Sequence, residues 1–365
     1  MLGKDDLTYY INYFYEKLKD EVSYEEKVSI SLEAVEIFIM VGDFKSAKEI
    51  TNKLLNSEEF SKYKIEVKYK ILDMMHRILH KEGNLNEAVE ILKKTLEIVG
   101  DSEELKCKAF VKLGNLHLKM GNFEEAKKYY TQAIYIGERL KEIVCLASAF
   151  NNVAIYHAIA NMDHDKALMF LQKALSIYEN VKPNSSITGR ILANLGNLFK
   201  EKKMFGKAQD YYQKAHTIAA KLKRYDLLAH IYLGKSELYY EIGEYEVSRV
   251  FANKALNFYK LVNGKESKSW MADAYIVLAK ISVKLNEPYE SVKKMLDEAI
   301  GLVSEIGNWE KLVRLYELAC DLTVEYGHKA EAEELLQKAI KISETHGLKL
   351  HIDRVNNKMN YIKYI

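Results

Sequence analysis

The sequence predicts an all-α protein built as a long array of helical hairpins, and three observations support this fold class. The 365 residues contain two prolines, Pro183 and Pro288, whereas average usage would give about 18. Because proline breaks helices, its scarcity favours helix over most of the chain. The length exceeds what one hydrophobic core usually organises. Apolar residues also recur at helical spacing, in units of about 41 residues.

The composition is that of an ordinary folded chain, with 48% hydrophobic and 29% charged residues. The formal net charge is +2, which is too small for the uniformly basic field of a protein that binds nucleic acid without specificity. We therefore expect no nucleic acid partner, and any basic site has to be local.

Cys107, Cys145 and Cys320 are an odd number of cysteines, far apart and without a CxxC pair. This spacing predicts neither a disulfide framework nor a zinc site. The first residues, 1–6, include acidic side chains and lack the apolar core of a signal peptide. We therefore expect a cytoplasmic protein with reduced thiols.

One stretch, residues 143–162, runs without a formal charge for long enough to span a bilayer. Asn151, Asn152 and His157 lie near its middle, where polar side chains are costly in hydrocarbon. The repeat register also assigns this stretch to a buried helix and its turn, so we expect no membrane partner.

Taken in order, residues 1–22 are predicted to form an N-terminal capping helix, residues 24–346 about eight helical hairpins, and residues 347–365 a C-terminal capping helix. Each cap carries an apolar stripe, which a repeat array needs at its ends because its terminal faces have no neighbour. The stripes are Leu7, Tyr10, Ile11, Phe14 and Leu18, and then Leu348, Ile352, Val355, Met359 and Ile362. The pattern continues in register across the loops at 183–186 and 263–267, so a single domain over residues 1–365 is expected.

The clearest hairpin lies between residues 110 and 133. Its first helix places Phe110, Leu113, Gly114 and His117 on one face, and its second helix does the same with Ala126, Tyr130 and Ala133. The small residues at 114, 126 and 133 predict a close approach of the two helices.

The turn of this hairpin also follows from its residues. Gly121 can adopt the left-handed conformation that ends a helix, and Asn122 with Glu125 has the spacing of a capping box. The turn signature recurs along the chain at Gly42, Gly83, Gly243 and Gly327, while Lys203 keeps the spacing without glycine.

These small and aromatic positions resemble the tetratricopeptide repeat family, over about residues 24–346. The period exceeds the 34 residues of the standard repeat, which is similar to the long-repeat branch of kinesin light chains, spindle-orientation adaptors and bacterial peptide-responsive regulators. The resemblance implies a right-handed superhelix, an α-solenoid, in which the first helix of each hairpin lines a concave groove.

The sequence contains no nucleotide-binding loop, HExxH, GxSxG or EF-hand pattern. We therefore expect no enzyme, no catalytic residue, no cofactor and no metal. His76 and His80 share a helical face but lack a following carboxylate ligand, so packing or surface roles are favoured. His157 occupies the aromatic position of neighbouring repeats and is expected to pack there.

Asparagines mark the predicted groove. An asparagine amide both donates and accepts hydrogen bonds, so it can bind the main chain of an extended peptide. Asparagine is also a poor helix former, and its clustering inside helices therefore calls for a reason. The alternative is that these amides hydrogen-bond between helices or to water. The residues are Asn115, Asn151, Asn152, Asn194 and Asn197.

Residues 188–224 carry nine bases and two acids, a local balance of +7. Arg190 lies four residues before Asn194 and is predicted to face the groove, as is Lys200. In co-chaperone members of the resembling family, a basic and asparagine set grips a terminal carboxylate. Val111 stands where a clamp lysine would be, so we do not expect a true carboxylate clamp.

The sequence therefore predicts a non-enzymatic scaffold that holds an extended, acidic peptide segment along repeats three to five. Asparagines would bind the peptide backbone, and Arg190 with Lys200 would supply charge complementarity. The alternative is a peptide-sensing regulator whose superhelix changes pitch when ligand binds and thereby alters contact with a partner protein.

Overall fold

The computed structural model describes residues 16, 23–160, 162–346 and 348–364. Within them the chain forms seventeen α-helices and one short 3-10 helix, with no strand. The predicted N-terminal helix over 1–22 and its stripe lie outside the described residues. Contacts divide the chain inside α10 into two compact units, unit 1 (Met1–Leu198) and unit 2 (Phe199–Ile365).

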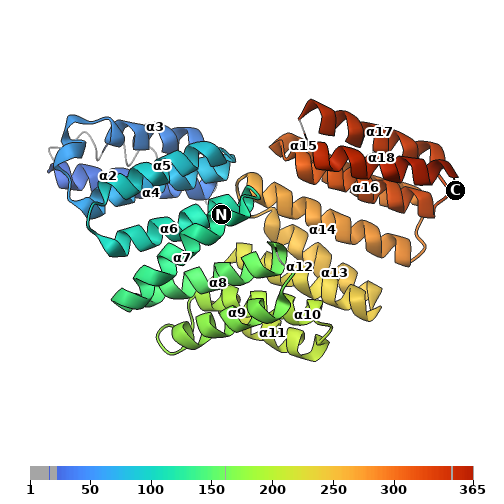
Figure 1. The fold of residues 1–365 in the computed structure, drawn as a ribbon, viewed down its shortest axis with the longest axis horizontal. Coiled ribbons are helices and arrows are strands. Elements are labelled where there is room, and N and C mark those ends of the chain that lie inside the picture. Colours follow the sequence, from blue (N-terminus) through green and yellow to red (C-terminus); the bar gives the residue numbers. More distant parts are fainter. Residues whose placement is uncertain (1–15, 17–22, 161, 347, 365) are drawn as a thin grey trace. The chain divides into compact units, whose positions relative to one another are not determined.

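The helices of unit 1 follow one another as hairpins, stacked in chain order (Figure 1). Each helix from α2 to α8 contacts the next, and α6 also contacts α8, the first helix of the following hairpin. The elements are α2 (Tyr24–Val41), α3 (Phe44–Leu55), η1 (Glu58–Lys62), α4 (Ile65–Glu82), α5 (Leu85–Ile98), α6 (Glu103–Lys119), α7 (Phe123–Leu140), α8 (Ile143–Ala160), α9 (His164–Glu179) and α10 (Ser186–Glu201).

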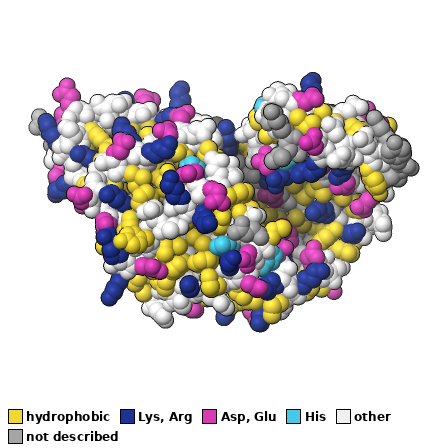
Figure 2. Space-filling model, in the orientation of Figure 1, with side chains coloured by type: hydrophobic (Ala, Val, Ile, Leu, Met, Phe, Trp, Pro, Cys, Tyr) yellow, Lys and Arg dark blue, Asp and Glu magenta, His cyan; other side chains and the backbone are white. Residues whose placement is uncertain are grey.

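Unit 2 repeats the same construction. Consecutive helices contact each other from α11 to α18, and α12 also contacts α14. The elements are α11 (Phe205–Lys221), α12 (Tyr225–Ile242), α13 (Tyr245–Tyr259), α14 (Lys265–Lys284), α15 (Tyr289–Ile306), α16 (Trp309–Glu325), α17 (Lys329–Thr345) and α18 (Lys349–Tyr364). The structure is therefore an α-solenoid of consecutive helical hairpins, as the periodicity predicts. Acidic and basic side chains are intermingled on the face seen in Figure 2.

Small residues bring the two helices of a hairpin together, as predicted. Ala126 and Ala133 are fully buried, and so is Tyr130 between them. A methyl group on Gly114 would overlap the Tyr130 ring, with 2.6 Å to Cδ1. The tyrosine ring therefore fills the space that glycine leaves open.

The turns between paired helices have the left-handed backbone that the glycines predict. Gly121 has a φ of 76°, and Lys203 and Asn286 adopt φ values of 56° and 53° without being glycine. The capping box predicted at Asn122 is wrong, because its side chain makes no capping hydrogen bond. Backbone bonds fix this turn instead, from Gly121 N to Leu118 O and from Asn122 N to His117 O.

Helix α8 contains most of the uncharged stretch identified in the sequence. Residues 143–160 are long and apolar enough to cross a membrane, with a mean hydropathy of 1.5. In the structure α8 packs against α6, α7 and α9, as the repeat register predicts. It buries Ala147, Ala149 and Ala154 completely and Asn151 almost completely.

The last helix, α18, packs on α17. It buries Val355, Met359 and Ile362 of the predicted C-terminal stripe. Beside this stripe, Arg354 Nε lies 2.7 Å from Glu317 Oε1 on α16. The apolar end of the array is thus covered by an amphipathic helix.

Candidate functional site

A pocket of about 400 Å³ opens in unit 1, between residues of α4, α6, α8 and α10. We call it the amide pocket, because three of the predicted asparagines line it. The lining residues are Tyr69, Lys108, Val111, Lys112, Asn115, Val144, Cys145, Ser148, Asn151, Asn152, Ile187 and Arg190. Three bases and no carboxylate are among them.

Helix periodicity explains which side chains reach this pocket. Lys108, Val111, Lys112 and Asn115 are spaced three and four residues apart on α6, and therefore share one face. Val144, Ser148 and residues 151–152 do the same on α8. Lys108 and Lys112 were not identified from the sequence as site residues, although their spacing from Asn115 places them on the same face of the helix.

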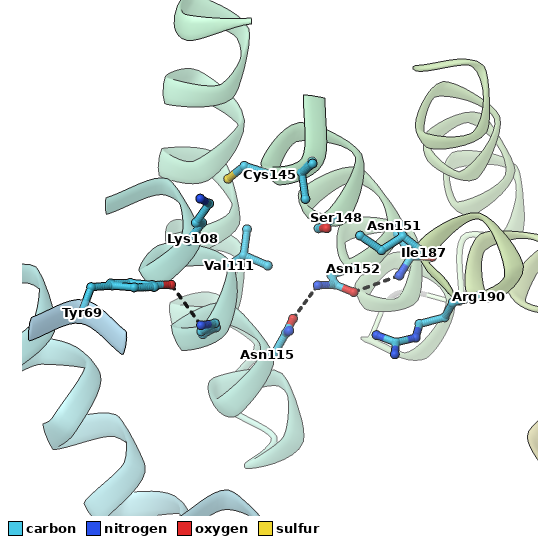
Figure 3. Close-up of a pocket in the computed structure, with 12 residues that line it drawn as sticks. Tyr69, Lys108, Val111, Asn115, Cys145, Ser148, Asn151, Asn152, Ile187 and Arg190 are labelled. Carbon is cyan, nitrogen blue, oxygen red and sulfur yellow. Dashed lines mark hydrogen bonds between the residues drawn. The ribbon is translucent and has the colours of Figure 1, made fainter. Parts of the chain in front are cut away.

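Four asparagines form a continuous chain of hydrogen bonds that we call the amide ladder. Asn194 Nδ2 donates to Asn151 Oδ1 at 2.9 Å, and Asn151 Nδ2 donates to Asn152 Oδ1 at 2.9 Å. Asn152 Nδ2 then donates to Asn115 Oδ1 at 2.6 Å, where the Tyr130 hydroxyl also donates at 2.9 Å. The two bonds along Asn151, Asn152 and Asn115 are drawn in Figure 3.

The amide ladder joins α10, α8 and α6, so the amides do hydrogen-bond between helices, as the alternative interpretation proposed. The amides are nevertheless not saturated. Both N–H groups of Asn115 Nδ2 have no partner in the part of the chain that the structure describes, and Asn152 keeps one N–H and one lone pair. Asn151 is 4% exposed, so its role is mainly internal.

The remaining predicted residues lie along α10. Arg190 is exposed, and its side chain extends from α10 into the open side of the pocket (Figure 3). Asn194 anchors the ladder, whereas Asn197 is half-buried and does not line the pocket. The Lys200 ammonium also lies outside it, ion-paired with Glu237 and, at 3.2 Å, with Glu201.

The charges at the α4 side of the pocket are balanced. Lys112 forms an ion pair with Asp73, and its Nζ lies 3.0 Å from the Tyr69 hydroxyl. Burial lowers the pKa of Lys112, but Asp73 and Tyr69 outweigh burial and raise it overall. Lys108 binds Glu104 at 2.5 Å, and Glu104 is not part of the lining. Lys108 and Lys112 are thus each ion-paired with a carboxylate that does not line the pocket, and Arg190 is the third base of the lining.

A disulfide joins Cys107 on α6 to Cys145 on α8, so the prediction of reduced, unpaired cysteines is wrong for these two. They lie 38 residues apart in sequence, close to one repeat, which places them on neighbouring first helices with a Cα–Cα distance of 6.2 Å. Cys145 also lines the amide pocket. Cys320 is buried as a free thiol, and burial raises its pKa to about 11.

The histidines pack as the sequence predicts. The His157 ring stacks on Phe170 with 5.5 Å between ring centroids, and His117 stacks on Tyr129 at 5.3 Å. His76 is buried and stacks on His80. Among the described residues, no group of three or more His, Cys, Asp or Glu side chains is placed to hold a metal ion.

A comparison with known protein families finds a match for part of the chain. The family model described as tetratricopeptide repeat matches residues 70–142 and 145–221. These segments contain the hairpin between residues 110 and 133 and the four asparagines of the amide ladder. These two segments of the chain are therefore similar to tetratricopeptide repeats.

Two curated relatives are similar to this chain in sequence. The Arabidopsis thaliana protein Kinesin Light Chain-Related 1 is 25% identical over 233 residues, covering 62% of this chain and 32% of the relative. A TPR repeat-containing protein of Methanocaldococcus jannaschii is 23% identical over 337 residues, covering 82% of this chain and 54% of the relative. The chain thus spans about a third and about half of their lengths.

Solved structures share the fold. A Rap protein complexed with Competence and Sporulation Factor has a TM-score of 0.61 and 16% identity, with 93% of this chain and 98% of that chain covered. The apo form of RapI has a TM-score of 0.56 and 17% identity, with 76% and 98% covered. At these identities the likeness shows the helical-hairpin fold.

Proposed function

We propose that the protein is a binding scaffold whose amide pocket holds an extended, acidic segment of a protein or peptide. The observation that carries this proposal is the lining itself, which combines three bases with unsaturated amides and no carboxylate. A carboxylate-free basic pocket favours acidic ligands, and it disfavours basic ones by like-charge repulsion.

The unpaired donors and acceptors of the asparagines match those of a peptide main chain. The two free N–H groups of Asn115 can donate to a carbonyl, and Asn152 offers one donor and one acceptor. Such groups recognise an extended backbone irrespective of its side chains. Val111, Val144 and Ile187 provide apolar contacts beside them.

Charge recognition falls mainly to Arg190, because Glu104 already pairs with Lys108. The planar Arg190 guanidinium can bind a carboxylate through two parallel hydrogen bonds. In this proposal Asn194 positions Asn151, and Asn197 continues the polar face along α10. Lys200 adds little attraction, because Glu237 and Glu201 already neutralise its charge.

An array of immobilised ten-residue peptides tests the proposal. Glu-rich, Gln-rich and Lys-rich sets are probed with the full chain and with Arg190→Ala and Asn152→Ala. We expect the wild type to retain the Glu-rich set. Arg190→Ala should lose about 10-fold or more in affinity, since a hydrogen bond to a charged group contributes about 1.5–3 kcal/mol. Asn152→Ala should lose up to about 10-fold, since a hydrogen bond to the neutral main chain contributes about 0.5–1.5 kcal/mol.

The matched control is Arg314→Ala, which removes an exposed arginine from α16 in unit 2. It should bind the Glu-rich peptides like the wild type. Equal retention of Glu-rich and Lys-rich peptides by the wild type, or unchanged binding by Arg190→Ala, would contradict the proposal.

A second candidate is the peptide-sensing regulator, and the fold likeness to the Rap protein complexed with Competence and Sporulation Factor favours it. In that function, ligand binding would change the pitch of the helical array and its contact with a partner. A cytoplasmic location remains part of the proposal. Fractionation of cells followed by immunodetection of the chain tests the location, and recovery of the chain outside the cytoplasmic fraction would contradict it.

A further inference from the structure

Lys235 stands at a position that other repeats fill with a core residue. It lies eight residues before the turn residue Gly243, as Leu113 lies before Gly121 and Met75 before Gly83. Leu113 is fully buried and Met75 is 3% exposed. A position that breaks a local rule of the fold is a candidate for function.

Lys235 is buried without a carboxylate partner. It is 8% exposed, and so is Glu317; among the described residues these two are the most deeply buried Lys, Arg, Asp or Glu side chains. Glu317 is paired with Arg354. The Lys235 ammonium instead donates to Gln213 Oε1 at 3.3 Å, and no carboxylate of a described residue lies within ion-pair distance.

A second lysine contacts the same aromatic ring as Lys235. The Lys254 ammonium of α13 lies over the rings of Tyr232 and Phe251, 5.8 and 5.5 Å from their centroids. Within the described residues it makes no ion pair. Lys235 lies 5.8 Å from the same Phe251 ring. The buried Lys235 of α12 and the exposed Lys254 of α13 therefore both contact the Phe251 ring.

The electrostatics of this region lack a compensating anion. Burial lowers the pKa of Lys235, and the nearby charge of Lys254 lowers it further. The pKa of His216 on α11 is lowered as well, mainly by burial and also by the charges of Lys235 and Lys254. A buried cation is costly unless it is paired, so the region is complementary to an anion.

We propose that Lys235 and Lys254 form a phosphate site between α11, α12 and α13, which takes the dianion of a phosphate monoester or inorganic phosphate. A phosphate carries about −1.5 to −2 charge near neutral pH and so matches two ammonium groups, whereas a carboxylate matches one. Tyr232, whose hydroxyl oxygen lies 2.9 Å from His216 Nε2, and the Gln213 amide can add donors.

This site is distinct from the amide pocket. Its residues belong to unit 2, whereas the amide pocket lies in unit 1. On α12, Lys235 is also two residues from Glu237, which places the two on opposite faces of the helix. Glu237 is the residue that neutralises Lys200.

Isothermal titration of the full chain with inorganic phosphate tests the site. We expect saturable binding of one phosphate by the wild type, and at least a tenfold loss of affinity in Lys235→Met and in Lys254→Met. Methionine is the residue at the equivalent position 75, so Lys235→Met should fold and melt at a higher temperature than the wild type. Lys260→Met, an exposed lysine just after α13, should bind phosphate like the wild type.

Two further arms complete the design. Acetate should bind at least tenfold more weakly than phosphate, because it carries one charge. Phosphoserine that binds tenfold more tightly than inorganic phosphate would identify a phosphorylated side chain as the source, and equal affinity would identify free phosphate. No saturable phosphate binding by the wild type, equal acetate binding, or unchanged binding by both folded lysine variants would overturn the proposal.

Discussion

Single residues decide how closely the helices of a hairpin approach, and two helical glycines show opposite consequences. Gly114 leaves room for the Tyr130 ring, which a Cβ atom would overlap. Gly301 lies exposed inside α15, and a Cβ atom there would meet nothing within 4 Å. The same chemical change is therefore expected to act in opposite directions at the two positions.

Gly114→Ala should lower the free energy of unfolding by about 1–3 kcal/mol, the usual cost of overpacking a core. Gly301→Ala should raise it by about 1 kcal/mol, because alanine favours an exposed helix interior over glycine. Urea unfolding followed by circular dichroism measures both. Equal effects of the same sign at the two sites would contradict the packing described for Tyr130.

Gly114→Ala also bears on the site, because Tyr130 donates to Asn115 in the amide ladder. The presence of asparagines on this face was predictable from the repeat register. The direction of each hydrogen bond was not, because it depends on side-chain rotamers that the sequence does not encode locally. Ladder formation explains why Asn151 is buried despite its polar side chain.

At the scale of the element, the hairpins were predictable because the repeat period, the small residues and the turn glycines all indicate the same pairs of helices. Glycine does not mark every turn, because Lys203 and Asn286 adopt the left-handed conformation without being glycine. The Cys107–Cys145 link was missed because sequence separation was taken as spatial separation. In a repeat array, a separation of one period instead brings side chains on successive first helices together.

The disulfide ties α6 to α8, the two helices whose amides Asn115 and Asn152 bind each other. Closing a loop of this length contributes up to about 4 kcal/mol through the unfolded state. Dithiothreitol should therefore lower the melting temperature of the wild type. The Cys107→Ser, Cys145→Ser double variant should melt at that lower temperature with or without the reductant.

Cys320→Ser serves as the control, and its response to dithiothreitol should equal that of the wild type. Thiol titration of the denatured, unreduced chain should find one free thiol, that of Cys320. Three free thiols in the purified protein, with no effect of reductant on unfolding, would contradict the link between α6 and α8.

At the scale of the whole molecule, the sequence predicts one domain over residues 1–365, and this stays a prediction. The amide pocket draws its residues from positions 69–190, within unit 1. Ligand binding therefore does not require unit 2 to change. For a rigid scaffold, small-angle scattering should give the same radius of gyration with and without a saturating Glu-rich peptide. Contraction on binding would instead support the regulator.

The most direct test of the central claim observes the amides themselves. Full-length protein labelled with ¹⁵N-asparagine is titrated with a Glu-rich decapeptide, and the side-chain NH₂ signals are assigned by single Asn→Ala variants. The account predicts saturable shifts for Asn115 and Asn152, and none for Asn253, an exposed asparagine of α13. Signals of Asn115 and Asn152 that stay fixed while the peptide binds would contradict it.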